Sequence, residues 1–259
     1  MGKFEIDTDD GFSNFDLEII HEKSGGFISA NKTLFDNLNL SENIKIVLEE
    51  SIKGTVMLKI GNGSPKVMLV AGVHGNELSP QIACSYLIDY LLDSDINGTV
   101  YIVPFASPKA SMDSSRRINH IDANRSAHKE GTNTNAILNK AMELKVSALG
   151  DFHSTAPNTN PGKEGIFASK EPSSESLTIA DYIANKMGSD AIKYNKAGIP
   201  FKGALEDEIN LAGIPSVTCE VFAPVSFASE KHTKRSFMQM LYFLDYFGII
   251  NHDDSLQLD

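Results

Sequence analysis

Two residues of types that bind transition metals stand three positions apart in the first third of the chain. His74 and Glu77 follow the apolar run of residues 67–73, with Gly75 and Asn76 between them. If that run is a strand, both side chains lie just after its carboxyl end, where α/β proteins bind ligands. An imidazole and a carboxylate that face one point can ligate a borderline metal such as zinc. The alternative is an ordinary turn, because a Glu at the start of a helix is also favoured by the helix dipole.

A third candidate ligand follows a later apolar stretch. His153 belongs to the sequence Asp-Phe-His-Ser-Thr of residues 151–155, at the end of that stretch. A catalytic zinc has three protein ligands and an open fourth position, whereas a structural zinc usually has four ligands and includes cysteines. Neither Cys84 nor Cys219 belongs to these motifs. The pattern therefore predicts one catalytic zinc ion per chain.

A dense group of basic and amide side chains lies between these candidate ligands. Arg116, Arg117, Asn124 and Arg125 fall within residues 116–125. Guanidinium groups hold carboxylates in a planar two-point grip, and they stabilise an oxyanion as it forms. The segment predicts an anion site, and ion pairing at the surface is the alternative.

One acidic residue interrupts the last apolar stretch. Glu220 stands within the otherwise largely apolar residues 216–222. Burying a carboxylate is costly unless it is paired or used. If it is aimed at the site, Glu220 is a candidate general base whose pKa is tuned by its surroundings. The alternative is an exposed face of an edge strand.

Alternating strand and helix patterns are expected to position these groups. Continuous apolar runs predict buried strands, and longer periodic stretches predict helices. The predicted strands cover residues 66–72, 100–103, 145–151 and 216–221, and the predicted helices cover residues 77–92, 134–144, 177–187, 205–211 and 237–247. We therefore expect a three-layer α/β/α sandwich around a mostly parallel, mixed sheet, in one domain of residues 1–259.

Three further segments complete the expected organisation. Residues 44–48 and 55–60 are predicted to form the two strands of a hairpin. Residues 157–176 are rich in Pro, Ser, Gly and Asn, and they predict either a loop at the rim of the pocket or a plain surface loop. Residues 1–40 are polar and only weakly periodic, which predicts a possible N-terminal extension.

Composition and charge exclude several classes of partner. The chain has 34 acidic and 23 basic residues, so its net charge of −11 should repel nucleic acid. No apolar run approaches 18 residues, and the start of the chain lacks an apolar signal core. Two cysteines cannot form a disulfide framework. We expect a cytoplasmic protein without a membrane or nucleic-acid partner, and the sequence indicates no oligomeric state.

The order of these motifs resembles the zinc metallocarboxypeptidase superfamily. That superfamily includes carboxypeptidase A-like enzymes and the succinylglutamate desuccinylase/aspartoacylase branch, and the resemblance runs from about Lys66 to Val221. The sequence Gly-Val-His-Gly-Asn-Glu at residues 72–77 resembles the deacylase branch, and so does the spacing of eight residues between Arg117 and Arg125. Residues 203–207 instead look like the segment that carboxypeptidases carry before their catalytic Glu.

The resemblance implies a role for each metal-site residue. His74, Glu77 and His153 would bind zinc, and Asp122 would fix the tautomer of His74, as carboxylates do for metal-bound imidazoles in general. Glu220 would take a proton from water and later give it to the leaving amine.

The resemblance also implies how substrate is held. Arg117 would polarise the scissile carbonyl, with Arg116 as the alternative if the register differs by one residue. Asn124 and Arg125 would bind the substrate carboxylate. The mobile tyrosine of the family has no clear match, although Tyr194 is a candidate.

These roles imply a zinc-dependent hydrolase that cleaves an amide bond close to a free carboxylate. Only 39 residues follow Glu220, so we expect no additional lid domain and prefer a carboxypeptidase-like activity on small peptides. The alternative is an N-acyl amino acid deacylase of the succinylglutamate desuccinylase/aspartoacylase type. A further alternative is an inactive relative that binds a carboxylate ligand.

Overall fold

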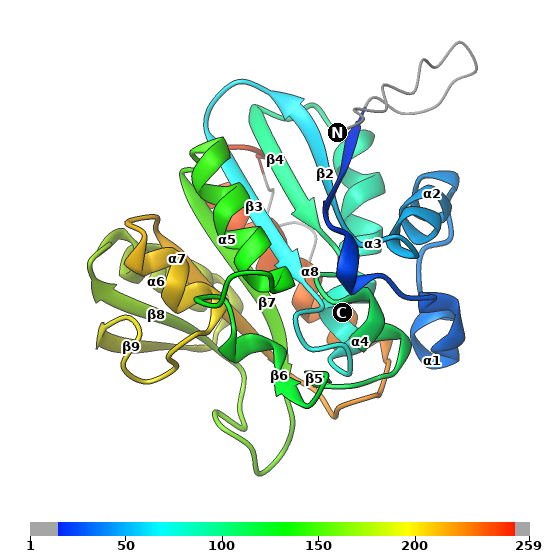
Figure 1. The fold of residues 1–259 in the computed structure, drawn as a ribbon. Coiled ribbons are helices and arrows are strands. Elements are labelled where there is room, and N and C mark those ends of the chain that lie inside the picture. The colour runs from blue at the N-terminus through cyan, green and yellow to red at the C-terminus, as the bar shows by residue number, and fades with distance from the viewer. Residues whose placement is uncertain (1–14, 252–259) are drawn as a thin grey trace.

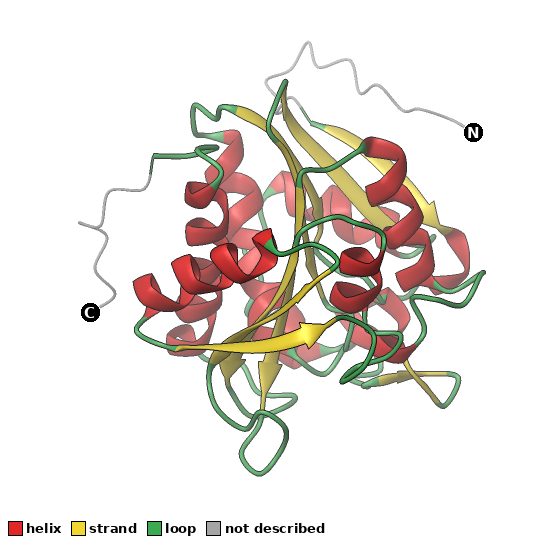
Figure 2. Ribbon diagram, turned by 90° about the vertical axis from the view of Figure 1, so that its left-hand side faces the viewer, coloured by secondary structure: helices red, strands yellow, loops and turns green. Residues whose placement is uncertain are grey.

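A mixed sheet runs through the middle of the protein, with helices on both of its faces (Figures 1 and 2). The computed structural model describes residues 15–251. Within them the large sheet has the strand order β1-β2-β4-β3-β7-β10-β8-β9. Its strands are β1 (Asp16–His21), β2 (Thr55–Asn62), β3 (Lys66–Ala71), β4 (Gly98–Val103), β7 (Ala148–Thr155), β8 (Gly165–Glu171), β9 (Asp190–Lys196) and β10 (Ser216–Phe222).

The centre of this sheet is parallel. Strands β4, β3, β7 and β10 all run in one direction, and β9 is parallel to β8 at one edge. Antiparallel pairs join β1 to β2, β2 to β4, and β8 to β10. The carboxyl ends of the four central strands therefore meet at the same edge. The predicted three-layer α/β/α sandwich around a mixed sheet is confirmed.

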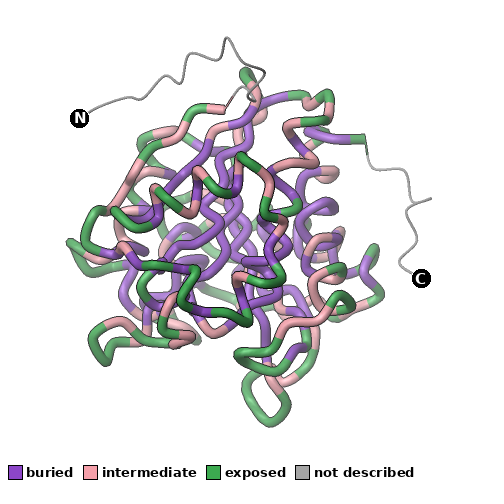
Figure 3. The backbone as a smooth tube through the Cα atoms, turned by 90° about the vertical axis from the view of Figure 1, so that its right-hand side faces the viewer, coloured by how far each residue is buried: buried purple, intermediate pink, exposed green. Residues whose placement is uncertain are grey.

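Each face of the sheet has its own hydrophobic core. In β3, Val67 and Leu69 pack into one core, while Met68 and Val70 pack into the other, as the alternation of a strand requires. Figure 3 shows the buried backbone passing through the middle of the molecule. The first core lies beneath α1 (Lys32–Phe35), α2 (Glu42–Ser51), α3 (Leu78–Leu92), α6 (Glu175–Met187) and α8 (Glu230–Tyr246). The second lies beneath α5 (Asn133–Leu144) and α7 (Leu205–Leu211).

Most predicted helices match the structure closely, but α8 is longer than expected. Helices α3, α5, α6 and α7 begin within two residues of their predicted starts. Helix α8 begins at Glu230 rather than at residue 237, because its first two turns are polar and carry no apolar period. The Ser229 hydroxyl accepts a hydrogen bond from the His232 amide and caps this start. Among the described residues, none of the helices has both the length and the apolar character needed to cross a membrane.

The predicted hairpin is wrong in its first half. Residues 44–48 belong to helix α2, and only the second segment, β2, is a strand. Ser41 caps the helix by accepting a hydrogen bond from the Ile44 amide at 3.2 Å. Ile44, Val47 and Ser51 are buried on one face at helical spacing. The short apolar run thus reflects one side of a helix, an ambiguity that periodicity alone does not resolve.

Three strands lie in segments where the sequence predicted no strand. Strand β8 falls inside residues 157–176, and its buried part is only Gly-Ile-Phe-Ala-Ser, which is too short to show a clear alternation. Strand β9 is mostly polar and lies at an edge. Strand β1 forms the opposite edge, and Ile28 and Leu34 enter the first core. From residue 15 onward, the predicted N-terminal extension therefore packs into the same sheet and core; residues 1–14 lie outside the described part.

Candidate active site

Three neighbouring strands bring the candidate residues to the same edge of the sheet. His74 follows the end of β3, His153 lies near the end of β7, and Glu220 lies near the end of β10. In the parallel pairing of β7 with β10, Glu220 is directly opposite His153. Strand β10 is internal, between β7 and β8, so Glu220 does not sit on an edge strand.

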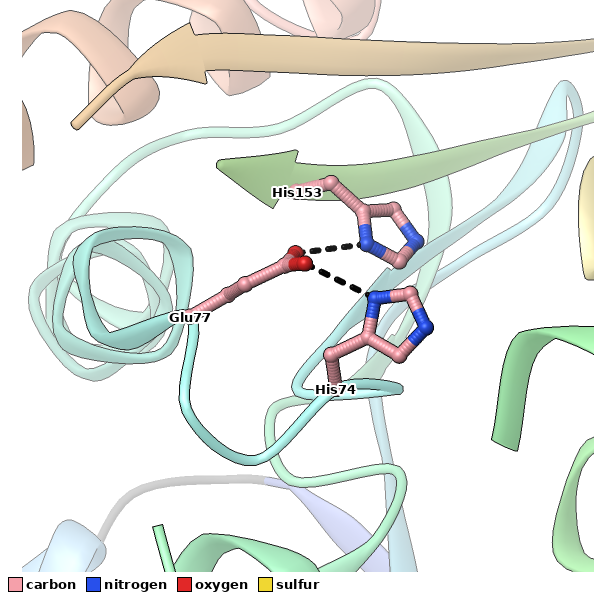
Figure 4. Close-up of side chains that lie close together, drawn as sticks. All are labelled: His74, Glu77 and His153. Carbon is pink, nitrogen blue, oxygen red and sulfur yellow. Dashed lines mark hydrogen bonds and ion pairs between the residues drawn. The ribbon is translucent and has the colours of Figure 1, made fainter. Parts of the chain in front are cut away.

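The three predicted zinc ligands converge. The Glu77 carboxylate lies 2.8 Å from His74 Nδ1 through Oε1 and 2.7 Å from His153 Nδ1 through Oε2. Figure 4 shows both rings turned toward this carboxylate. One ligand atom from each residue lies within 4.8 Å of the others, and all three residues are buried. Two imidazole nitrogens and one carboxylate oxygen are a donor set that suits Zn²⁺.

A close backbone contact shapes the loop that carries the first two ligands. A Cβ built on Gly75 would lie 2.0 Å from the backbone carbon of Ala110, so no side chain fits there. Ala110 belongs to α4 (Pro108–Met112). The Gly75 amide also donates to the Ser115 carbonyl at 2.8 Å. Gly75 thus lets the loop pack tightly enough to turn His74 and Glu77 toward each other.

The outer nitrogens of both rings face carboxylates. His74 Nε2 lies 2.9 Å from Asp122 Oδ1, which is where the predicted tautomer-fixing residue was expected. His153 Nε2 lies 2.9 Å from Asp151 Oδ2, an ion-pair contact without hydrogen-bond geometry. Such contacts leave Nδ1 of each ring free to act as the metal ligand. Asp151 was not predicted as a site residue, although it lies two residues before His153 on one strand and therefore on the same face.

Electrostatics support Glu77 as an ionised ligand. Burial by itself raises the pKa of Glu77, but the charges and hydrogen bonds of His74 and His153 outweigh it and hold that pKa below its usual value. The Ser154 amide also donates to Glu77 Oε2 at 3.0 Å. A carboxylate must be deprotonated to bind a metal, so this environment fits the role.

Glu220 shows the opposite behaviour. Burial, followed by the nearby Glu77 charge, raises the pKa of Glu220 to about 8, although His153 opposes the shift. Glu220 lines the pocket, and within residues 15–251 its Oε2 atom has no hydrogen-bond partner. A carboxyl group with a pKa near neutrality can both accept and donate a proton.

Arg116, rather than Arg117, faces the site. Its Nη1 donates to Glu77 Oε1 at 3.2 Å, and its Nε donates to Asp122 Oδ2 at 3.0 Å. Arg116 lines the pocket. Arg117 is exposed in the small strand β5 (Arg117–Ile118) and is not a lining residue. The structure therefore places the alternative arginine beside the metal ligands, because neighbouring residues of an extended segment point to opposite sides.

A pocket lined by His74, Arg116, His153 and Glu220 extends to a second set of residues. Asn124 and Arg125 line it, as the sequence predicted for the anion site. The Asn124 Oδ1 atom accepts a hydrogen bond from the Leu205 amide at 2.8 Å. Tyr194, a candidate from the sequence, also lines the pocket. The other lining residues had no role assigned from the sequence: Asn160, Phe167, Phe201, Ala204, Glu206 and Thr218. Asn160 and Phe167 fall within residues 157–176, which were predicted to form a loop at the pocket rim or a plain surface loop, and Ala204 and Glu206 fall within the carboxypeptidase-like segment 203–207. No local pattern marks Phe201 or Thr218.

Fold and site together define a carboxypeptidase-like α/β protein with a His-Glu-His cluster at the carboxyl ends of its parallel strands. The profile of the succinylglutamate desuccinylase/aspartoacylase catalytic domain matches residues 63–234, and the chain belongs to this family. The predicted membership of the metallocarboxypeptidase superfamily is confirmed, and the chain is a member of a hydrolase superfamily. A search of curated proteins found no match.

Solved structures share the fold at low sequence identity. A succinylglutamate desuccinylase/aspartoacylase from Rhodobacter sphaeroides is 18% identical, with a TM-score of 0.60 over 78% of this chain and 62% of that one. The product-bound ectoine utilization protein EutE (DoeB) from Ruegeria pomeroyi is 19% identical, with a TM-score of 0.61 over 81% and 66%. A metallo-carboxypeptidase from Burkholderia cenocepacia is 15% identical, with a TM-score of 0.58 over 74% and 60%. The chain thus spans less than two thirds of the length of each.

Proposed function

We propose that this protein is a zinc-dependent amide hydrolase of the deacylase type, which releases an amino acid from an N-acyl amino acid with a free carboxylate. The family match favours this branch over the carboxypeptidase-like activity preferred from the sequence. Because relatives at this distance share the fold alone, the substrate is inferred from the site. Location in the cytoplasm stays a prediction from the sequence.

One observation carries the proposal. The Glu220 carboxyl group lines the same pocket as the candidate ligands His74 and His153, and its Oε2 has no hydrogen-bond partner within residues 15–251. An inactive relative that only binds a carboxylate would have no use for this costly buried group. A hydrolase needs it as a general base.

Each residue of the site has a place in this chemistry. When bound by His74, Glu77 and His153, Zn²⁺ supplies Lewis acidity at the reacting carbonyl. Glu220 accepts a proton from the attacking water and returns it to the leaving nitrogen. Arg116 donates hydrogen bonds to the carbonyl oxygen as that oxygen gains negative charge.

The remaining residues hold the substrate and the metal site in place. Asn124 and Arg125 bind the free carboxylate, and Arg125 does so through a charge-assisted pair. Asp122 and Asp151 hold the rings of His74 and His153 in the orientation that presents Nδ1.

A peptide substrate is the second candidate. Helix α7 follows residues 203–204, and this region contributes Ala204 and Glu206 to the pocket. The corresponding sequence resembles the segment that carboxypeptidases carry before their catalytic Glu. The C-terminal residue of a short peptide also presents a free carboxylate next to an amide bond.

A direct competition tests the proposal. The values of kcat/KM are measured on N-acetyl and N-succinyl amino acids and on tri- to pentapeptides, with protein whose metal content is known. We expect about one zinc per chain and a preference of at least about tenfold for the acyl amino acids, equal to about 1.4 kcal/mol of transition-state binding. A tenfold preference for peptides would reverse the assignment.

The free carboxylate and the metal provide two controls. Amidation of the substrate carboxylate is expected to lower kcat/KM by about 10- to 100-fold, the worth of a charge-assisted hydrogen bond. Equal turnover of acid and amide would contradict the role of Arg125. Absence of a transition metal from active protein would contradict the zinc site.

A further inference from the structure

A second buried carboxyl group lines the pocket, and the proposed chemistry does not use it. Glu206 lies in the first turn of α7 and is only 4% exposed. Within residues 15–251 its Oε1 atom has no hydrogen-bond partner. Asp207, the next residue, is fully buried, and within the same residues its Oδ2 atom also has no hydrogen-bond partner.

Within the described residues, this acidic pair has no ion-pair partner of positive charge. Burial, followed by the charge of Asp207, raises the pKa of Glu206 well above its usual value. The Ser169 hydroxyl donates to Asp207 Oδ1 at 3.3 Å, and Glu206 has hydrogen bonds to Asp207 and to the Ser169 backbone. No Lys, Arg or His of residues 15–251 forms an ion pair with either carboxyl group. A buried carboxylate is stable only with a partner of opposite charge or with several donors.

Three aromatic rings form a wall of the same pocket. The Phe167 and Tyr194 rings are stacked with centroids 6.1 Å apart. The Phe201 ring meets them edge-on, 5.7 Å from Phe167 and 5.5 Å from Tyr194. All three residues line the pocket together with Glu206. Aromatic faces attract ammonium and guanidinium groups, so this wall and the carboxyl group favour the same kind of ligand.

The ring cluster already attracts a cation from the protein. The guanidinium carbon of Arg125 lies 5.4 Å from the centre of the Phe201 ring. Arg125 belongs to the proposed carboxylate-binding pair, so the anion site and the aromatic wall are adjacent. The Leu205 amide donates to Asn124 Oδ1 at 2.8 Å, which ties the start of α7 to the same pair. Glu206 is therefore held at a defined place relative to the substrate carboxylate.

We propose that Glu206 and the aromatic wall of Phe167, Tyr194 and Phe201 form a cation subsite that selects substrates with a positively charged side chain. The substrate class is then an Nα-acyl amino acid with an ammonium or guanidinium group, held by its carboxylate at Arg125 and by its cation at Glu206. This inference rests on the proposed function for the reaction, but the subsite itself is a binding property. Glu206 acts as a specificity residue and takes no part in bond cleavage.

Matched substrates test the subsite. The values of kcat/KM are compared for Nα-acetyl-lysine against Nα-acetyl-norleucine, and for Nα-acetyl-arginine against Nα-acetyl-citrulline. Within each pair the length is similar and the charge differs. We expect at least about a tenfold preference for the cationic member of one pair or both, the size typical of a charge-assisted contact. The Glu206→Gln variant is expected to reduce that ratio to within about threefold of unity.

Glu208→Gln is the matched control. Glu208 lies on the same helix, is partly buried, accepts a hydrogen bond from the Gly203 amide at 3.1 Å, and does not line the pocket. This variant is expected to keep the wild-type ratio. A ratio measured with one enzyme is insensitive to partial misfolding, because inactive protein lowers both values equally.

Calorimetry separates the subsite from the reaction. Binding of the free amino acids L-lysine and L-arginine is compared with that of L-norleucine and L-citrulline, in the parent and in Glu206→Gln. Tighter binding of a cationic member that is lost in Glu206→Gln supports the subsite, even if no acyl amino acid is hydrolysed and the proposed function fails. Hydrolysis of both members of each pair at equal rates overturns the subsite and leaves the proposed function standing. Equal binding within both pairs, or binding of none of the four, also overturns it.

Discussion

Glu77 in the metal-ligand cluster and Glu206 in the pocket wall are almost equally buried and behave in opposite ways. Glu77 is 3% exposed and Glu206 is 4% exposed. Glu77 contacts two imidazoles, a backbone amide and a guanidinium, and its pKa is lowered. Glu206 has an unpartnered oxygen within residues 15–251, and its pKa is raised. Pairing, rather than depth, therefore decides which buried carboxyl group is ionised.

The contrast divides the pocket into two ends. At the metal end, carboxylates and rings form a network that is ready to hold a cation of charge +2. At the far end, Glu206 and Asp207 each have one oxygen without a hydrogen-bond partner within residues 15–251, and Glu206 lines the pocket together with three aromatic rings. Glu220 lies between the two and shares the raised pKa of the unpaired group. The metal end is thus suited to catalysis, and the far end is suited to binding the side chain of a substrate.

Glu220→Gln should have the largest effect, because it removes an unpaired carboxyl group while preserving its shape. We expect kcat/KM to fall by about 100- to 10,000-fold, which is the usual worth of a positioned general base. Metal content, measured by elemental analysis, should stay the same. If the variant keeps a tenth of the parent activity, Glu220 is not the base.

The neighbouring arginines provide a matched pair. Arg116→Ala removes the guanidinium that faces the metal end and should lower kcat by about 100- to 1,000-fold, as loss of an oxyanion donor does. Arg117→Ala removes an exposed side chain outside the pocket and should change kcat by less than about threefold. Steady-state kinetics of the two variants decide the register of this segment, and the reverse order of effects would assign the role to Arg117.

Asp122→Asn should weaken metal binding without changing any of the three metal ligands. The change removes the charge beside His74 Nε2, so metal affinity should fall by about 10- to 100-fold. Competition with a chelator of known affinity measures this. Asp113→Asn, an exposed change before the same segment, serves as the control and should leave the affinity unaltered. An unchanged affinity in Asp122→Asn would mean that the carboxylate does not support the ring.

The smallest effect concerns the thermal stability of the protein and the contribution of Glu206 to it. A carboxyl group whose folded pKa is raised opposes folding as the pH rises above its ordinary value of 4.5, because ionisation must then occur in a buried place. The neutral Glu206 carboxyl group makes its full contribution to the free energy of unfolding below pH 4.5. That contribution is lost as the pH rises toward the pKa of Glu206 in the folded protein. Glu206→Gln removes this loss, so its Tm should fall less than that of the parent between pH 5 and pH 8.

Thermal unfolding at fixed metal content measures that difference. We expect about 2–4 °C, which corresponds to about 1 kcal/mol in a domain of this size. Glu220 also has a raised pKa, but both proteins retain it, so its contribution cancels. Identical pH dependence in the two proteins would show that Glu206 is ionised or solvated in the folded state.

Local patterns in the chain predicted those parts of the fold that depend on local physics. The continuous apolar run of β3 requires burial on both faces, and α7 begins and ends at the predicted residues. The helix at residues 44–48 escaped prediction because a five-residue apolar stretch suits either structure. Strand β9 escaped because edge strands are polar and are stabilised by their neighbour β8 rather than by their own pattern.

The sequence by itself determined the chemical elements of the site. Residue types, spacing and position after apolar runs were enough to select His74, Glu77, His153 and Glu220, because parallel strands place their carboxyl ends at one edge. Only the tertiary structure decided which arginine faces them, that Asp151 supports His153, and that Glu206 shares a pocket with three aromatic rings. These relations join segments that are far apart in the chain. They depend on how helices and loops pack against the sheet, and no local period records that packing.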